Sequence, residues 1–324
     1  MNEFLEPFER MLETIAMPAQ VRAVEAGAPA GPMWDGLAGS GFLDALVPEE
    51  RGGAGLPLME VHPLWQALGR HAVPLPVGET MIARFLLAVA GSDIPEGAIA
   101  IVEAGSAAET IMPFGLVAEQ LLVEAGGRLH LVPTGAIKPS STGVTGSVAA
   151  RVHWEELAGH GICAAPEGGL RAMGAILRAT LMAGAADRLL EMTAAFANER
   201  IQFGKPIGRQ QALQQNLAMM AEDVVASRVA SQIGCAGGLP PSPVAAAIAK
   251  SVTSSAAARI AATAHAVHGA LGISDEHDLQ FFTRRLYEWR LADGAETYWN
   301  RALGAIRLAA DMGSSDFVRM QLTV

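Results

Sequence analysis

The spacing of apolar residues divides the chain into two helical stretches separated by a short region of different period. From Phe4 to Ile15, apolar side chains recur every three or four residues, and Pro18 ends the pattern, as expected of an amphipathic helix. The same spacing continues between proline and glycine breaks. It predicts further helices over residues 34–47, 58–70 and 78–91.

Residues 96–160 change to the alternating or β-branched pattern of short strands. Gly126 and Gly127 separate two of these strands and are typical of a hairpin turn. A loop is predicted over 139–143. The strands are predicted over residues 98–103, 120–124, 129–132 and 148–153, which is enough for a small sheet.

Residues 165–324 return to helical spacing in longer runs, with Leu213, Leu217 and Met220 on one face. Helices are predicted over roughly 168–199, 209–236 and 242–270, then from about 275 onward, and over 294–311. Long helices joined by short turns indicate an antiparallel bundle. The chain is therefore predicted to be mainly α. Its predicted parts are a helical domain over 1–95, a small β-domain over 96–160 and a helical bundle over 161–324.

The 324-residue chain carries a formal net charge of −10, which argues against a nucleic-acid partner, because nucleic-acid-binding surfaces are basic. Its two cysteines, Cys163 and Cys235, form no CxxC motif, so neither a disulfide framework nor a thiolate metal site is expected. The first residues lack the basic start of a signal peptide, and no uncharged apolar run reaches spanning length. We expect a cytoplasmic protein without a membrane partner.

Common nucleotide and metal motifs are absent from the sequence. No GxGxxG follows a predicted strand, and neither GxxxxGK[ST] nor HExxH occurs. The triplet Glu276-His277-Asp278 has two interpretations: a metal site, or the acidic first turn of a helix capped by Ser274 and Asp275. Because no second cluster has ligand spacing, we favour the helix cap and predict no metal.

The turn over residues 199–208 carries the most specific chemistry in the chain. It places Arg200, Phe203 and two glycines where one long helix ends and the next begins. A cation beside a helix N-terminus suits the phosphate groups of a cofactor. The alternative is structural: Arg200 compensates the C-terminal helix dipole, Phe203 fills the core, and the glycines only form the turn.

Three segments together resemble the acyl-CoA dehydrogenase family. Residues 199–218, ERIQFGKPIGRQQALQQNLA, are similar to its RxQFGKPI motif and the glutamine-rich helix start that follows. Residues 268–279, HGALGISDEHDL, followed by Arg284-Arg285, resemble its HGGxGxxxEHDL…RR stretch. Residues 48–55, PEERGGAG, are similar to its PEExGGxG. The resemblance covers nearly the whole chain, and the order of helices, small sheet and four-helix bundle is also that of the family.

The resemblance implies an FAD enzyme that oxidises acyl-CoA thioesters to 2,3-enoyl-CoA. In this family a carboxylate removes the α-proton, the β-hydride passes to the flavin, and the electrons leave to an electron-transfer flavoprotein. A neighbouring subunit completes the FAD site, so at least a dimer is expected. By resemblance, Arg200 meets the FAD diphosphate and Phe203 lies against the cofactor. The full set of expected FAD contacts is Arg200, Phe203, Gln210, Gln211, Gly269 and Gly272.

The family's usual base is the glutamate of an EGT motif, nine residues after an arginine. Counting from Arg284 leads to Asp293, in the segment LADGAET. Asp293 is therefore the candidate catalytic base; the alternative is a capping-box-like pairing with Glu296 at the start of the last bundle helix. The family's other base position, on the first bundle helix, falls near Gly174 and offers no carboxylate.

The chain lacks several residues of the family pattern, and these differences indicate which kind of family member it resembles. The family's arginine on the first bundle helix falls on Ala175, with Arg171 and Arg178 as nearby candidates. The sheet region is short and lacks the TEP…GSD segment that supports flavin and substrate in the family. In these features the chain resembles one subunit of the heteromeric acyl-CoA dehydrogenases of bacterial steroid catabolism.

We expect this protein to be an acyl-CoA dehydrogenase or a subunit of one, as a homo-oligomer or in complex with a second such chain. The alternative is a non-catalytic helical partner that scaffolds another dehydrogenase chain.

Overall fold

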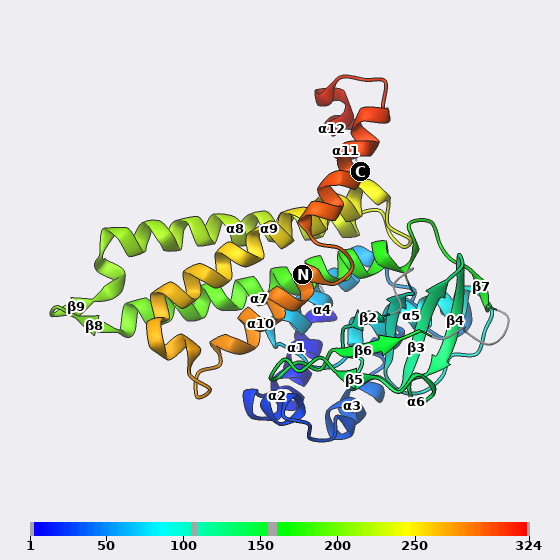
Figure 1. Cartoon of the computed structure of the whole chain (residues 1–324), viewed down its shortest axis with the longest axis horizontal. Coiled ribbons are helices and arrows are strands. Elements are labelled where there is room, and N and C mark those ends of the chain that lie inside the picture. The colour runs from blue at the N-terminus through cyan, green and yellow to red at the C-terminus, as the bar shows by residue number, and fades with distance from the viewer. Residues whose placement is uncertain (1–2, 105–108, 155–160, 323–324) are drawn as a thin grey trace.

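The computed structural model describes residues 3–104, 109–154 and 161–322. Figure 1 shows a long helical bundle, with the N-terminal helices beneath it and the strands at one end. The last two helices project away from the body. This is the mainly α fold with a small β region that the sequence predicts.

The N-terminal helices pack their apolar faces into the common core. They are α1 (Leu5–Ile15), α2 (Pro18–Glu25), α3 (Gly31–Ala38), α4 (Leu58–Arg70) and α5 (Val77–Val89). Phe8 and Leu12 of α1 are fully buried, in agreement with the predicted face. The prediction of one helix over 34–47 is wrong. Helix α3 ends at Ala38, Gly41 takes a left-handed φ of +80°, and only a short 3-10 turn follows.

The β region forms two small sheets, with strand orders β1–β3–β4–β7 and β2–β6–β5. Their strands are β1 (Ile99–Glu103), β2 (Glu109–Met112), β3 (Gln120–Ala125), β4 (Arg128–Pro133), β5 (Ser140–Ser141), β6 (Ala150–His153) and β7 (Cys163–Ala164). The predicted hairpin is confirmed: β3 and β4 are antiparallel, and Gly126 and Gly127 between them have φ of +56° and +71°.

Strands β2, β5 and β7 are not predicted by the sequence; β5 and β7 have only two residues each, too few for an alternating pattern to show. Strand β5 lies inside the predicted loop 139–143 and depends on its pairing with β6. One turn of helix, α6 (Thr134–Ile137), follows β4.

The predicted bundle is confirmed. It consists of α7 (Gly169–Glu199), α8 (Gln211–Cys235), α9 (Pro243–His268) and α10 (Leu279–Leu291). Helix α7 is the central element, since it packs against α4, α8, α9 and α10. At one crossing the backbones of α4 and α7 touch. A Cβ added to Gly184 would lie 1.9 Å from the carbonyl oxygen of Gln66.

The start of α10 differs from the sequence prediction, because the helix predicted from about 275 begins at Leu279. Ser274 does accept a hydrogen bond, from the Glu276 amide to its Oγ at 3.3 Å, but this bond closes a turn ahead of the helix. His277 Nδ1 then accepts a hydrogen bond from the Leu279 amide at 3.1 Å. The predicted cap is therefore only partly right.

The chain ends in a projecting arm made of α11 (Glu296–Ala309) and α12 (Ser314–Leu322). Helix α11 agrees with the helix predicted over 294–311, whereas α12 is not predicted. The arm carries apolar side chains into solvent, and Leu308 is 87% exposed. Among the residues that the structure describes, none of the helices has the length and apolarity needed to span a membrane.

Candidate functional site

Asp293 lies in the turn between α10 and α11, with a left-handed φ of +56°. Helix α11 begins at Glu296 with Ala295 as its N-cap residue, and no side chain caps it. The interpretation of Asp293 as a helix cap is therefore wrong. Its carboxylate turns toward α7 instead, where Oδ2 lies 3.3 Å from Nε of Arg178.

Arg178 joins Asp293 to a second buried carboxylate. Its Nη2 lies 2.5 Å from Oε1 of Glu79 on α5, and both of these side chains are 1% exposed. The ring of Phe114 lies 5.4 Å from the guanidinium carbon. The Nη1 atom of Arg178 makes no hydrogen bond to any residue that the structure describes. One guanidinium thus bridges two carboxylates from separate elements.

The protonation of this cluster is governed by burial. Burial raises the pKa of Asp293 above its usual range, while Arg178 and then Lys250 oppose the shift by favouring the anion. Burial likewise raises the pKa of Glu79 against the opposing effect of Arg178. A carboxylate whose pKa is raised is a stronger base, so the environment of Asp293 is suited to proton abstraction.

Gly174, one turn before Arg178 on α7, provides the space that Asp293 occupies. A Cβ added at Gly174 would lie 2.5 Å from Cγ of Asp293 and 2.6 Å from Oδ2. The sequence shows Gly174 only as the lack of a second candidate base. In the structure, the Asp293 carboxylate occupies the space that a side chain at position 174 would fill.

Lys250 on α9 is a site residue that the sequence analysis does not identify. It is completely buried, and its Nζ donates hydrogen bonds to the carbonyl oxygens of Arg290 and Gly294, both at 2.8 Å, and to Ser254 Oγ at 3.2 Å. Burial lowers the pKa of Lys250 to about 7. The signal in the sequence that could have found it is a lysine surrounded by small and apolar residues on an alanine-rich helix.

A further cation borders this cluster at the edge of the β region. Nε of Arg171 lies 2.7 Å from Oε2 of Glu103 on β1, and its guanidinium carbon lies 4.8 Å from the ring centre of Tyr298 on α11. Both charged side chains are about one-third exposed. Arg171 on α7 therefore connects that helix to β1 and α11.

Arg200 and Phe203 lie at the other end of α7, in a hairpin of β8 (Ile201–Gln202) and β9 (Lys205–Pro206). Phe203 is 91% exposed at the tip of this hairpin, with a φ of +53°, so its interpretation as a core residue is wrong. The side chain of Arg200 is also exposed. It forms no ion pair among the described parts of the chain.

The two glutamines follow the hairpin at the start of α8. Gln210 is the N-cap residue of this helix but makes no side-chain capping bond, and Gln211 is exposed. The N-terminus of a 25-residue helix thus lies next to the hairpin. Its free amide groups and the Arg200 side chain favour an anion at this corner.

The two predicted glycines behave differently from each other. Gly269 takes a φ of +59° at an exposed position, and a Cβ added there would contact nothing within 4 Å. Gly272 is buried, and a Cβ there would lie 2.9 Å from Cδ2 of Leu279 and 3.0 Å from Cβ of His268. Packing within the chain therefore explains Gly272, while Gly269 remains open to solvent.

The ends of α7 and α9 meet at this corner of the bundle. The rings of Phe196 and His268 stack with centroids 4.4 Å apart. Arg200 follows Phe196, and Gly269 follows His268, so the structure brings the predicted cofactor contacts to one end of the bundle. We call this end, made of Arg200, Phe203, Gln210, Gln211 and Gly269, the hairpin corner.

The structure does not bring Asp293 to the hairpin corner. Asp293 contacts Arg178, and the stretch of α7 from Arg178 to Arg200 spans about 33 Å at the usual rise of about 1.5 Å per residue. One chain therefore carries two separate groups of candidate site residues at opposite ends of its central helix.

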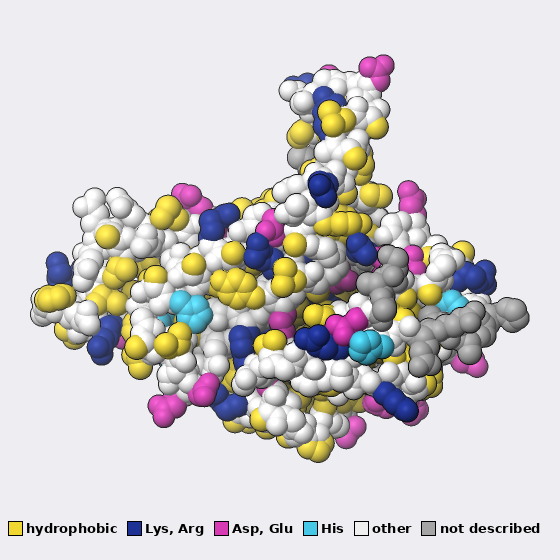
Figure 2. Space-filling view, in the orientation of Figure 1, with side chains coloured by type: hydrophobic (Ala, Val, Ile, Leu, Met, Phe, Trp, Pro, Cys, Tyr) yellow, Lys and Arg dark blue, Asp and Glu magenta, His cyan; other side chains and the backbone are white. Residues whose placement is uncertain are grey.

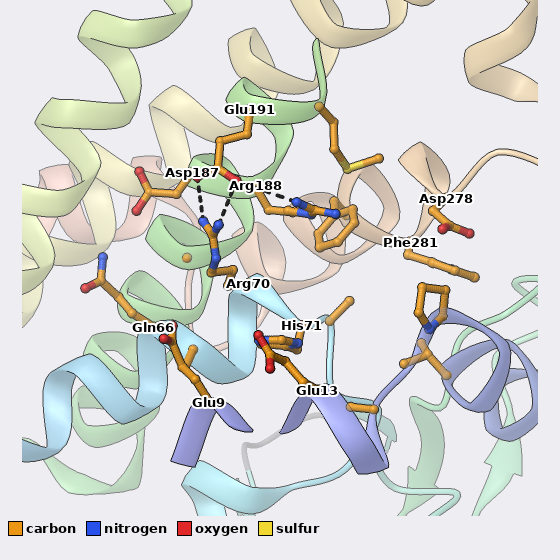
Figure 3. Close-up of a pocket in the computed structure, with 18 of the residues that line it drawn as sticks. Glu9, Glu13, Gln66, Arg70, His71, Asp187, Arg188, Glu191, Asp278 and Phe281 are labelled. Atoms are coloured by element: carbon orange, nitrogen blue, oxygen red, sulfur yellow. Dashed lines mark hydrogen bonds and ion pairs between the residues drawn. The ribbon is translucent and has the colours of Figure 1, made fainter. Parts of the chain in front are cut away.

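A wide groove of about 700 Å³ lies elsewhere, between the N-terminal helices and the bundle. Figure 3 shows Arg70 paired with Glu191 in its wall, with Glu9, Glu13 and His71 nearby. The Arg70–Glu191 pair is bidentate, with N–O distances of 2.9 and 2.7 Å. No predicted site residue lines this groove, so cavity size does not mark the candidate site.

Comparison of the sequence with known proteins identifies the family of this chain. The family model "Acyl-CoA dehydrogenase, C-terminal domain" matches residues 169–305, which run from α7 into α11. The acyl-CoA dehydrogenase IpdE2 of Mycobacterium tuberculosis is 32% identical over 254 residues, covering 76% of this chain and 77% of the relative. The chain belongs to the acyl-CoA dehydrogenase family.

Solved structures give the same fold. The Tcur3481–Tcur3483 steroid acyl-CoA dehydrogenase aligns with a TM-score of 0.81 and 23% identity, covering 94% of this chain and 98% of the matched chain. The ChsE4–ChsE5 complex from Mycobacterium tuberculosis aligns with a TM-score of 0.77 and 21% identity, covering 95% and 97%. The resemblance stated from the motifs is therefore confirmed for the family and the fold.

Acyl-CoA dehydrogenases are FAD proteins, and the hairpin corner suits such a cofactor. Among the residues that the structure describes, the Arg200 guanidinium has no ion-pair partner. It can therefore form two charge-assisted hydrogen bonds to a diphosphate. Phe203, held outward in a left-handed turn, offers an aromatic ring that is 91% exposed. The start of α8 adds free amide groups.

Proposed function

We propose that this chain carries out, or takes part in, FAD-dependent α,β-dehydrogenation of an acyl-CoA thioester, with Asp293 as the base. The observation that carries the proposal is the setting of Asp293. It is a mostly buried carboxylate in a left-handed turn, free of any capping role, and it fits the space left by Gly174. Helix packing alone does not require a carboxylate there.

In the proposed reaction, residues of this chain accept a proton and position the group that accepts it. Asp293 takes the proton from the α-carbon of the thioester, and its raised pKa makes it able to accept that proton. Arg178 holds the carboxylate in one orientation and stabilises its charge between turnovers. Bound FAD would accept the hydride from the β-carbon, so that a double bond forms between the two carbons.

The two groups of site residues support an assembly of at least two chains. Because Asp293 and the hairpin corner lie at opposite ends of α7, one FAD is completed by the hairpin corner of a neighbour. Exposed apolar side chains offer surface for such contacts, and Figure 2 shows them over the bundle and on the projecting arm. They include Met219, Val225, Val229, Leu291 and Leu308.

The neighbour is either a second copy of this chain or a second acyl-CoA dehydrogenase-like chain. The structural likeness to the ChsE4–ChsE5 complex, which contains two different chains, supports the second choice. So does the short β region, which leaves less of this chain to surround a flavin ring. Electrons would then pass to an electron-transfer flavoprotein.

A non-catalytic partner subunit is the second candidate function. The observation that favours it is the pairing of Asp293 with a fully buried arginine, which is also what a structural ion pair looks like. Aspartate is one methylene shorter than the glutamate usual in this family, and a misplacement of about 1 Å lowers a rate on the order of a hundredfold.

Flavin binding and its dependence on a second chain test the proposal. We expect the purified assembly to be yellow and to bleach when acyl-CoA is added without oxygen. Flavin that appears only when a second chain is supplied would identify the heteromer. An assembly that binds flavin but bleaches equally well with Asp293 replaced would assign the chemistry to the partner chain and leave this chain as the scaffold.

Reversing the charge at the hairpin corner is expected to release FAD. Loss of one charge-assisted bond is worth about 1.5–3 kcal/mol, so Arg200→Glu should weaken FAD binding at least roughly tenfold to a hundredfold. Lys138→Glu, at an exposed position in the β region, is the matched control and should bind FAD normally. Equal affinities for the two variants, measured by flavin fluorescence, would remove Arg200 from the site.

Filling the space at Gly174 is expected to disable the base. Ala at this position places Cβ 2.5 Å from Cγ of Asp293, so the carboxylate must move. We expect Gly174→Ala to slow flavin reduction by about a hundredfold without loss of bound FAD. The control is Gly304→Ala on α11, where an added Cβ meets nothing within 4 Å. Normal rates in both variants, measured by stopped-flow absorbance, would contradict the assigned position of Asp293.

A further inference from the structure

We infer that Lys250 is a positioning residue for Asp293, because it ties together the carbonyl groups on either side of Asp293 and so fixes the turn that aims the carboxylate. This inference rests on the proposed role of Asp293 as the base. Lys250 acts through the backbone, whereas Arg178 holds the Asp293 side chain directly.

The turn that Lys250 holds does not adopt an ordinary conformation. Asp293 and Gly294 are consecutive left-handed residues, with φ of +56° and +93°. Few non-glycine residues take this conformation; aspartate is among the types that tolerate it, at a cost that contacts with the surroundings offset. A right-handed backbone is intrinsically more favourable for Asp293, so contacts from outside the turn help to hold the observed conformation.

Side chains from two other helices enforce the turn. Nζ of Lys250 binds the carbonyl oxygens of Arg290 and Gly294, both at 2.8 Å. Nε1 of the buried Trp299 donates to the carbonyl oxygen of Asp293 at 3.0 Å. The carbonyls on both sides of Asp293 therefore converge on one atom of α9. A change at that atom is transmitted to the Asp293 backbone.

A lysine fits this position better than the other cations. The three hydrogens of an ammonium group match three acceptors, namely two carbonyl oxygens and the hydroxyl of Ser254. Of the chain's three lysines, Lys138 and Lys205 are exposed, and Lys250 alone is buried. A buried ammonium is retained at a free-energy cost unless it is fully hydrogen-bonded, which this one is.

The hydrogen bonds persist in either protonation state of the amine. If Lys250 loses a proton, its two remaining hydrogens still serve the two carbonyls, and the Ser254 hydroxyl can donate to the nitrogen instead. The charged groups that face Lys250 are Asp293 and Glu296, which attract it, and Arg178 and Arg290, which repel it. The backbone restraint therefore holds on both sides of neutral pH.

The test compares three variants in the complete flavin-loaded assembly. Lys250→Met removes all donors at similar volume, and Lys250→Gln restores amide hydrogens on a shorter side chain. Thr253→Val is the matched control, because Thr253 is buried on the same helix but donates only within α9, to the carbonyls of Ala249 and Lys250. Amide hydrogen exchange of residues 290–296 is measured together with kcat and KM.

For Lys250→Met we expect exchange of residues 290–296 to be about tenfold faster, since two hydrogen bonds to this turn are lost. We expect kcat to be about a hundredfold lower with KM little changed. Lys250→Gln should lie between Lys250→Met and the wild type, and Thr253→Val should match the wild type in both measurements. If Lys250→Met does not fold, the comparison of Lys250→Gln with Thr253→Val decides the question.

Unchanged exchange over residues 290–296 in the lysine variants would overturn the inference, and so would faster exchange with a normal kcat. Failure of the proposed function looks different. In that case Asp293→Asn itself would retain full rate, whatever the lysine variants do. The two failures are therefore distinguishable when Asp293→Asn is measured beside the lysine variants.

Discussion

Asp293→Asn is expected to lower the rate of flavin reduction by acyl-CoA on the order of a thousandfold, within the range that a general base contributes. The amide cannot accept the α-proton, yet it has nearly the size of the carboxylate and can still accept a hydrogen bond from Nε of Arg178. Bound FAD should stay at the wild-type level, because the hairpin corner lies at the other end of α7. Loss of rate without loss of flavin would thus separate chemistry from cofactor binding.

Stopped-flow absorbance of the flavin, without oxygen, measures this rate directly. Asp44→Asn is the matched control, since Asp44 also pairs with an arginine, with 2.7 and 2.9 Å bonds from Arg84, but lies in the N-terminal part of the chain. We expect the control to reduce its flavin at the wild-type rate. A rate for Asp293→Asn that equals the control would show that another group removes the proton.

Arg178→Met is expected to destabilise the protein by about 3–5 kcal/mol, the usual effect of breaking a buried ion pair from one side. The substitution leaves Glu79 and Asp293 buried without their shared guanidinium. The surface pair of Arg259 with Asp223 provides the comparison, since its arginine side chain is 60% exposed. Arg259→Met should change the free energy of unfolding by only about 1 kcal/mol or less.

The effect of Arg178→Met should depend on pH in a defined direction. Burial raises the folded-state pKa of both Glu79 and Asp293, and removal of the nearby cation raises it further. A carboxyl group with a raised folded-state pKa contributes stability at low pH that is lost as the pH rises through that pKa. The deficit of the variant should therefore be largest near pH 8 and shrink toward pH 5.

Urea denaturation at several pH values checks this expectation. The double variant Glu79→Gln/Arg178→Met should recover part of the lost stability near pH 8, because it removes one of the uncompensated carboxylates. A deficit that is the same at pH 5 and pH 8 would mean that Glu79 and Asp293 do not carry the charges assigned to them.

The helical part of the fold was predictable because its signals are local. Apolar spacing over 20 to 30 residues fixed α7, α8 and α9 within a few residues, and Gly126-Gly127 fixed the β3–β4 hairpin. Where structure depends on distant partners, the sequence was insufficient. Strand β5, for example, lies in a predicted loop and pairs with β6.

The candidate site was predictable only in part, for the same reason. Counting from Arg284 reached Asp293, and the motif residues 199–211 lie together at the hairpin corner. However, the environment of Asp293 is assembled from α5, α7 and α9, which are far apart in the sequence. Neither the space at Gly174 nor the bonds of Lys250 can be derived from local spacing. They explain why the turn holds a carboxylate in that position.

A structure of the flavin-loaded assembly with a bound, unreactive acyl-CoA analogue would show whether Asp293 reaches the substrate and whether Arg200 reaches the cofactor. We expect a carboxylate oxygen of Asp293 within about 3–3.5 Å of the thioester α-carbon, and Arg200 of a neighbouring chain at the FAD diphosphate. An acyl group bound far from an Asp293 that remains enclosed against Arg178, or a diphosphate that no Arg200 touches, would contradict it.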